Sequence, residues 1–159
     1  MMEFVYAYAY FILYAFLGWV CEDLYCGIPA KKFINRGFFY GPYCPIYGVG
    51  ALLVLYPLLF VKDYPILVFI LGVIITSTLE YITSWVMEIL FKTRWWDYSK
   101  RFMNINGRVC LLNSTLFGIM SIVVVYIVHP VIQDIVMDIP LTALMSFLSA
   151  FTIGFGIDC

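Results

Sequence analysis

The sequence predicts an all-α integral membrane protein with about five transmembrane helices. Of its 159 residues, 64% are hydrophobic and 12% are charged, whereas a soluble domain carries about 25% charged residues. The mean hydropathy is +0.97. A spanning helix needs about 17 to 25 apolar residues, and five runs approach or exceed this length: 4–20, 46–61, 64–91, 109–132 and 141–157. We therefore expect a single transmembrane domain over residues 1–159.

The first apolar run is expected to stay in the protein as a helix. It has no basic segment before it and no small-residue cleavage site after it, and a secretory signal peptide carries both. The segment that follows, 21–45, contains "GFFYGPYC", in which glycine and proline prevent a regular helix. Its aromatic content is too high for a solvated connector. We expect this segment to be re-entrant or to lie at the membrane interface.

The basic residues indicate which loops face the cytoplasm. Eight of the nine lie in two segments, and short cytoplasmic loops collect Lys and Arg. Loops 21–45 and 92–108 are therefore predicted to be cytoplasmic in a multi-pass protein of the bacterial cytoplasmic membrane, with the N-terminus outside and the C-terminus inside. The eight are Lys31, Lys32, Arg36, Lys92, Arg94, Lys100, Arg101 and Arg108, and only Lys62 lies elsewhere.

The composition argues against several classes of function. A net charge of −1 offers no basic patch for nucleic acid, and no phosphate-binding or dinucleotide-binding glycine motif is present, so we expect no cofactor. The five cysteines follow no metal-ligand spacing and lie at or near the predicted cytoplasmic side, where thiols stay reduced. We predict five free thiols, no disulfide and no metal site.

The third apolar run contains the most informative polar residues. Glu80, Ser84 and Glu88 are spaced by four residues and so share one face of a helix. A charged side chain inside a membrane costs roughly 2 to 3 kcal/mol or more. Glu88 can reach the interface, but Glu80 lies two turns deeper. We expect Glu80 to be protonated or paired, with Arg36 and Arg108 as the preferred partners.

The second long loop combines anchoring aromatic residues with many hydrogen-bonding groups. Trp95, Trp96 and Tyr98 are of the types that settle at a membrane interface. The motif "NING" predicts a turn in which Gly107 takes a positive φ and directs Arg108 back toward the membrane. The hydrogen-bonding side chains of the loop and of the run after it are Asp97, Tyr98, Asn104, Arg108 and Asn113.

These residues define a candidate polar site at the cytoplasmic end of the helices. Three interpretations stay open: a buried network that fixes helix packing, a ligand or ion site, and a catalytic centre. The single histidine, His129, is predicted near the outer surface, which removes the usual general base and favours a protein that is not an enzyme. The candidates are Glu22, Asn35, Arg36, Glu80, Ser84, Glu88, Asp97, Tyr98, Asn104, Arg108 and Asn113.

Four motifs, in order along residues 15–120, give the chain a resemblance to a known family. They are "GWVCED", "KFINRGFFYGPYCPIYGVGA", "LEYITSWVMEILF" and "WWDYSKRFMNINGRVCLLNS". The pattern resembles the CmpB-like family of bacterial membrane proteins, described as ABC transporters of type IV. The resemblance places Tyr47 among the motif residues, beside Glu22, Asn35, Arg36, Glu80, Glu88, Asp97, Tyr98, Asn104 and Arg108. One departure is Phe117 before Gly118, where family members carry tryptophan.

The resemblance implies a permease-like membrane subunit, with transport performed as a homo-oligomer or beside a separate ATPase subunit. Our leading hypothesis is that the subunit binds a small polar or cationic ligand at the cytoplasmic end of the helix bundle. A second hypothesis is a membrane-embedded enzyme acting on lipid or lipid-linked phosphate substrates, in which two arginines clamp a phosphate. A third is a non-catalytic scaffold or regulator. In all three the lipid bilayer is the surrounding partner.

Overall fold

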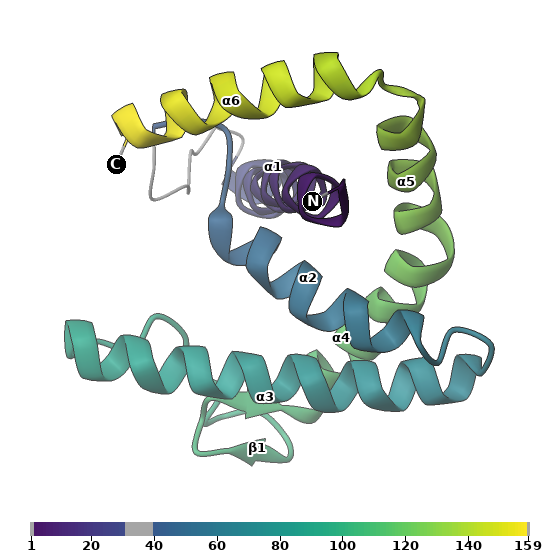
Figure 1. Cartoon of the computed structure of the whole chain (residues 1–159). Helices are drawn as coiled ribbons and strands as arrows, with labels where there is room; N and C mark the ends of the chain where they lie inside the picture. Colours follow the sequence, from purple (N-terminus) through teal and green to yellow (C-terminus); the bar gives the residue numbers. More distant parts are fainter. Residues whose placement is uncertain (1, 31–39, 159) are drawn as a thin grey trace. The chain divides into compact units, whose positions relative to one another are not determined.

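The computed structural model describes residues 2–30 and 40–158, with side chains described for 2–24 and 40–158. The chain divides into two compact units, and each is described by itself. Unit 1 consists of Met1–Leu53 and Pro130–Cys159, and unit 2 consists of Val54–His129. The expected all-α fold is confirmed, because helices dominate the described residues, whose two strands are only two residues long each (Figure 1).

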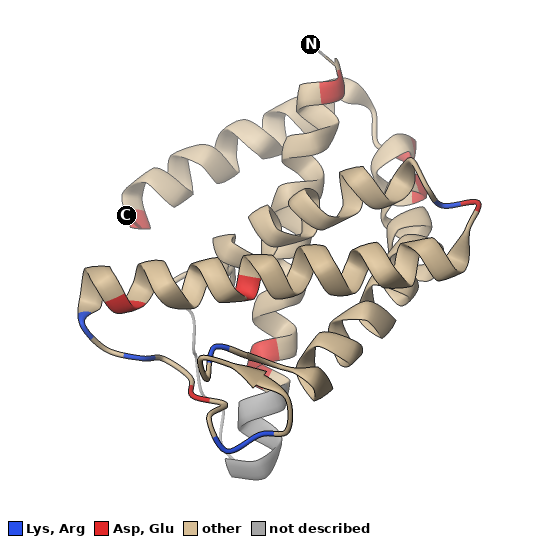
Figure 2. Cartoon of the chain, turned by 90° about the horizontal axis from the view of Figure 1, so that it is seen from below, with Lys and Arg blue, Asp and Glu red and all other residues tan. Residues whose placement is uncertain are grey.

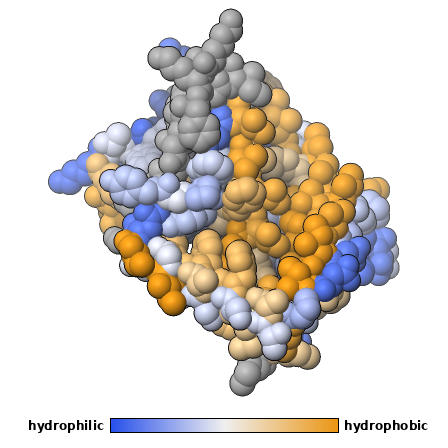
Figure 3. Space-filling model, turned by 90° about the horizontal axis from the view of Figure 1, so that it is seen from above, coloured by the Kyte–Doolittle hydropathy of each residue, from blue (hydrophilic) through white to orange (hydrophobic). Residues whose placement is uncertain are grey.

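Among the described residues, four helices are long and apolar enough to cross a membrane: Met2–Leu24 within α1, Pro65–Phe91, Leu111–Asp138 and Leu141–Asp158. The second predicted span is shorter, because α2 covers 15 residues, Pro45–Leu59. At about 1.5 Å per residue it measures about 22 Å, less than the roughly 30 Å of a hydrocarbon layer. Large apolar areas lie on the face shown in Figure 3, as lipid-facing helices require.

Unit 1 contains α1 (Met2–Ala30), the first part of α2, most of α5 (His129–Asp138) and α6 (Leu141–Asp158). Helices α1 and α6 meet where the Tyr8 hydroxyl and Thr152 Oγ1 lie 2.8 Å apart. The stretch before α2 is hydrogen-bonded to both helices. The Cys44 N–H donates to the Ala15 carbonyl at 3.0 Å, and the Gly41 N–H donates to Asp158 Oδ2 at 2.9 Å.

Unit 2 is built on α3 (Pro65–Phe91) and α4 (Leu111–Val123), which run antiparallel. Pro65 starts α3 at a position where its missing N–H is not needed. Ser77 Oγ donates to Ser114 Oγ at 2.7 Å near one end of the contact. Nearer the start of α3, Gly72 allows a close approach, because a Cβ there would lie 2.6 Å from the Ser121 side chain.

The helix that starts with α4 continues through the π-helical turn η1 (Val124–Val128) into α5. Pro130 accounts for this turn. A proline has no N–H, and its ring clashes with the carbonyl four residues earlier. A π-helical turn, in which the His129 N–H donates to the Val124 carbonyl, relieves that clash.

Two short strands follow α3, β1 (Asn104–Ile105) and β2 (Val109–Cys110), paired antiparallel with Ile105 opposite Val109. Figure 1 shows this hairpin beside α3. Residues 109 and 110 therefore belong to a strand rather than to the fourth span, which begins at Leu111. Cys21, Cys44 and Cys110 are free thiols, as predicted. Cys26 and Cys159 lie outside the described side chains.

Candidate polar site on helix α3

The chain reverses direction at the end of α3. Lys92 adopts a left-handed conformation with φ of 54°, a common way to end a helix. Residues 93–110 then return along the helix. The Asn106 side-chain amide donates to the Tyr81 hydroxyl at 2.8 Å, three turns before the end of α3. The loop is thereby attached to the helix.

The turn of the hairpin has the predicted conformation. Asn106 and Gly107 have φ values of 52° and 69°, the left-handed region in which Asn and Gly are favoured. A Cβ at Gly107 would also lie 2.4 Å from Ser99 Oγ. The loop around this turn is therefore too tightly closed for a larger residue at position 107.

Asp97 and Asn104, both predicted site residues, brace this loop. Asp97 Oδ1 accepts hydrogen bonds from the Ser99 N–H at 2.9 Å and from the Ser99 hydroxyl at 2.5 Å. These bonds hold the pKa of the Asp97 carboxyl below its usual value. Asn104 Nδ2 donates to the carbonyls of Ser99 and Arg101, and its Oδ1 accepts from the Gly107 N–H. Both side chains support local backbone structure.

Arg108 is the centre of the contact between loop and helix. It is 9% exposed, and its Nη2 lies 2.6 Å from Glu88 Oε2. Its Nη1 donates to Ser84 Oγ at 3.3 Å, and its guanidinium lies 5.7 Å from the centre of the Tyr81 ring, within cation–π range. The Arg108 side chain is thus directed against α3, and its expected direction toward the membrane stays a prediction.

The partner of Arg108 differs from the expected one, because Arg108 pairs with Glu88 and not with Glu80. Arg94 Nε adds a second cation, 3.1 Å from the other Glu88 oxygen. Figure 2 shows the basic residues of this loop beside the end of α3. The Glu88 charge is therefore balanced within unit 2. Arg36, the other expected partner of Glu80, and Asn35 lie outside the described residues.

Glu80 has different neighbours. Tyr98 from the loop and Asn113 from α4 interact with its carboxyl group through side-chain hydrogen bonding. Its Oε2 atom is buried and has no hydrogen-bond partner among the described residues. Burial, followed by the Glu80 charge, raises the pKa of Tyr98 to about 12. The Tyr98 hydroxyl therefore keeps its proton at neutral pH.

Two predicted residues lie in unit 1. The Tyr47 hydroxyl donates to Glu22 Oε2 at 2.6 Å. Close packing holds the two side chains together. Gly18 permits this packing, since a Cβ at Gly18 would lie 2.3 Å from Tyr47 Cβ. Near this pair, burial raises the pKa of the Cys44 thiol, and the nearby acids Glu22 and Asp23 add to the effect.

In unit 2, Arg108 contacts Ser84 and Glu88, and Tyr98 and Asn113 contact Glu80. Asp97 and Asn104 brace the loop and contact neither group. Convergence of all candidates on one pocket stays a prediction. Sequence reasoning missed the roles of Arg94, Tyr81 and Asn106. The available signal was the end of the apolar run after Phe91. If the chain reverses direction there, the residues that follow must pass back along α3 near Glu88. Nothing in the sequence pointed to the contact between Asp158 and the stretch before α2.

Comparisons with known proteins give one result. The profile of a family described as "Putative ABC-transporter type IV" matches residues 9–159. No curated protein matches the chain, and no solved structure matches it.

Proposed function

Since the chain belongs to the CmpB family of type IV ABC transporters, we propose that it is a permease-like membrane subunit that binds a small polar or cationic ligand at Glu80. The family match and the apolar helices support a membrane protein of the ABC-transporter type. The ligand site and its position in the membrane are the new parts of the proposal.

The proposed ligand site is based on one observation. Glu80 Oε2 is buried and has no hydrogen-bond partner among the described residues. A buried oxygen left without a partner costs about 1 to 3 kcal/mol, and more when it is charged. Glu88, on the same helix, is balanced by Arg94 and Arg108. Glu80 is therefore the carboxyl group on α3 whose charge a bound cation would satisfy.

The neighbours of Glu80 suit such a ligand. The raised pKa of Tyr98 keeps a hydroxyl donor beside the carboxyl group, and Asn113 offers both an amide donor and a carbonyl acceptor. A ligand with an ammonium or a similar N–H group would bind the Glu80 and Asn113 oxygens, while Tyr98 holds the other carboxyl oxygen. The ion pair of Arg108 with Glu88 would keep the loop that carries Tyr98 against α3.

In unit 1, α1 and α6 are both joined to the stretch before α2. Tyr8 of α1 contacts Thr152 of α6. Farther along each helix, Ala15 and Asp158 are hydrogen-bonded to residues 41–44. The proposed topology has five crossings, with α1 the first, the short α2 the second and α6 the last.

Five crossings also satisfy the charge distribution. They place both basic loops on one side, in agreement with the positive-inside rule. The N-terminus then lies outside, the C-terminus lies inside, and Glu80 lies in the cytoplasmic half of the membrane. The short α2 would cross with help from its flanking residues or from local thinning of the bilayer.

Transport energy would come from a second protein. The sequence contains no phosphate-binding loop of the kind that ABC ATPases use. We propose a separate ATPase subunit as the partner of this chain, either alone or with a second copy of the chain.

Exchange of Glu80 for glutamine tests the ligand site. Glu80→Gln keeps the size of the side chain and removes its charge, and Glu3→Gln is a matched control because Glu3 is exposed at the start of α1. Native mass spectrometry of each protein, extracted gently from its membrane, should show a small bound molecule in the unmodified protein and in the control. Glu80→Gln should lose it.

Two results would refute the ligand site. If Glu80→Gln keeps the same bound molecule, Glu80 does not bind it. If Glu80→Gln no longer folds while Glu3→Gln does, the polar cluster is a packing network.

A further inference from the structure

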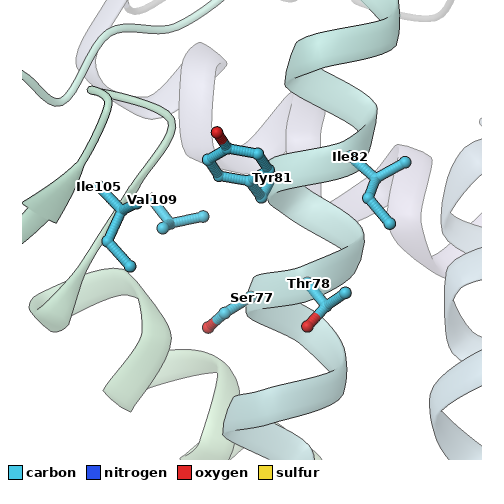
Figure 4. Close-up of a pocket in the computed structure, with 6 residues that line it drawn as sticks. All are labelled: Ser77, Thr78, Tyr81, Ile82, Ile105 and Val109. Atoms are coloured by element: carbon cyan, nitrogen blue, oxygen red, sulfur yellow. The ribbon is translucent and has the colours of Figure 1, made fainter.

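A groove lies on α3 next to the hairpin, apart from the Glu80 carboxyl group. Its volume is about 230 Å³, and it is lined by Ser77, Thr78, Tyr81, Ile82, Ile105 and Val109. Figure 4 shows Ser77 and Tyr81 on the side of α3 that faces Ile105 and Val109 of the hairpin. The groove is smaller than the roughly 300 to 1,000 Å³ of most small-molecule sites, and its lining is mainly apolar.

We place the groove in hydrocarbon from its position along α3. Its α3 residues begin 12 positions after Pro65, at Ser77, and at about 1.5 Å per residue they lie about 18 to 26 Å along the helix. A hydrocarbon layer that starts near Pro65 extends about 30 Å. Ile82 and Ile105 are 49% and 60% exposed, so the groove opens toward lipid.

The end of the groove nearer to the C-terminus of α3 is polar. The Tyr81 hydroxyl accepts a hydrogen bond from Asn106, and Arg94 Nη1 reaches the Asn106 carbonyl at 3.4 Å. Arg94 Nη2 donates to none of the described residues, and the arginine side chain is 39% exposed. A cation with unused donors therefore lies at the level where a lipid headgroup would begin.

The charge around this end is positive. Residues 88–108 carry five cations and two acids, Glu88 and Asp97. Glu88 is already held by two of the arginines. A cationic segment of this kind attracts the anionic lipids of the inner leaflet, so charge complementarity favours an anionic lipid over a neutral one.

We propose that the groove holds one acyl chain of an anionic phospholipid, whose phosphate faces Arg94 and Asn106. The chain would lie against Ile82, Ile105 and Val109, with its methyl end toward Ser77 and the middle of the bilayer. The bound lipid would fill the space between α3 and the hairpin. This lipid site is separate from the ligand site at Glu80 and does not depend on it.

Native mass spectrometry of the full chain tests the lipid site, with phosphatidylglycerol and phosphatidylcholine of identical acyl chains as probes. The unmodified protein should retain phosphatidylglycerol in preference to phosphatidylcholine. Thr78→Trp fills the groove and should lower retention of both lipids. Ile70→Trp is the matched control, because Ile70 is also exposed on α3 but does not line the groove.

A second variant addresses the headgroup without filling the groove. Arg94→Gln should lower the retention of phosphatidylglycerol about tenfold, the effect of losing one charge-assisted hydrogen bond. It should leave retention of phosphatidylcholine unchanged. Equal retention of the two lipids by the unmodified protein would overturn the proposal. So would equal losses in Thr78→Trp and Ile70→Trp, or an unchanged lipid preference in Arg94→Gln.

Discussion

Replacement of Arg108 by methionine is expected to detach the loop of residues 93–110 from α3. Methionine keeps much of the length of the side chain but removes its charge. The substitution eliminates the cation–π contact with Tyr81, about 0.5 to 2 kcal/mol, and the hydrogen bond to Ser84, about 0.5 to 1.5 kcal/mol. These two contacts alone predict a loss of about 1 to 3.5 kcal/mol, to which the broken Glu88 ion pair adds.

Thermal unfolding in detergent measures this loss. For a chain of this size, each 1 kcal/mol lowers Tm by about 2 to 4 °C, so Arg108→Met should lower Tm by about 2 to 14 °C. Arg94→Met is the control, because it removes a cation from the same carboxylate but leaves the Ser84 and Tyr81 contacts in place. Its effect should be smaller. Equal effects of the two variants, or no effect of Arg108→Met, would refute the central role of Arg108.

Three further predictions concern alkaline stability, helix packing and topology. The pKa of Tyr98 is raised from 10.0 to about 12 in the folded protein. The contribution of this hydroxyl to stability is therefore complete below pH 10 and is lost as the pH rises toward 12. Unfolding measured across this pH range should show a smaller loss of stability in Tyr98→Phe than in the unmodified protein. Gly72→Leu should destabilise the contact of α3 with α4 by about 1 to 3 kcal/mol, whereas Gly154→Leu, with no atom within 4 Å of its Cβ position, should have little effect on Tm. A membrane-impermeant maleimide applied to intact cells should label Lys62→Cys but not Lys100→Cys, and the opposite pattern would invert the topology.

The sequence was sufficient for the parts of the fold that depend on local patterns. Long apolar runs specify helices at membrane length, and they matched α3 and α6 closely. The "NING" motif specified a turn because Asn106 and Gly107 are of the few residue types that tolerate positive φ. Local signals of this kind need no knowledge of the neighbouring elements.

The choice of ion pairs could not be predicted in the same way. Glu80 and Glu88 lie on one helix face, and both are plausible partners for Arg108 from sequence. The outcome depends on how far the hairpin returns along α3, which is set by the left-handed Lys92 and by the pairing of β1 with β2. Such a distance follows from tertiary structure, so the sequence left both pairings open.

The neighbours of Glu80 show the same limit. Asn113 and Tyr98 were recognised as polar residues of the right region, but their shared contact with Glu80 requires the start of α4 and the loop to meet on α3. That meeting depends on the close packing at Ser77 and Ser114. The sequence indicated that Tyr98 and Asn113 belong to this region, and the fold determined that both contact Glu80.

A single purification tests the ligand site and the ATPase partner together. The tagged chain is purified from its own membrane under gentle conditions, in the unmodified form and as Glu80→Gln, and each sample is examined by native mass spectrometry. The proposed function predicts a stoichiometric ATPase subunit in both samples and a small polar or cationic molecule in the unmodified sample alone. A homo-oligomer without an ATPase, with the same small-molecule content in both samples, would contradict it.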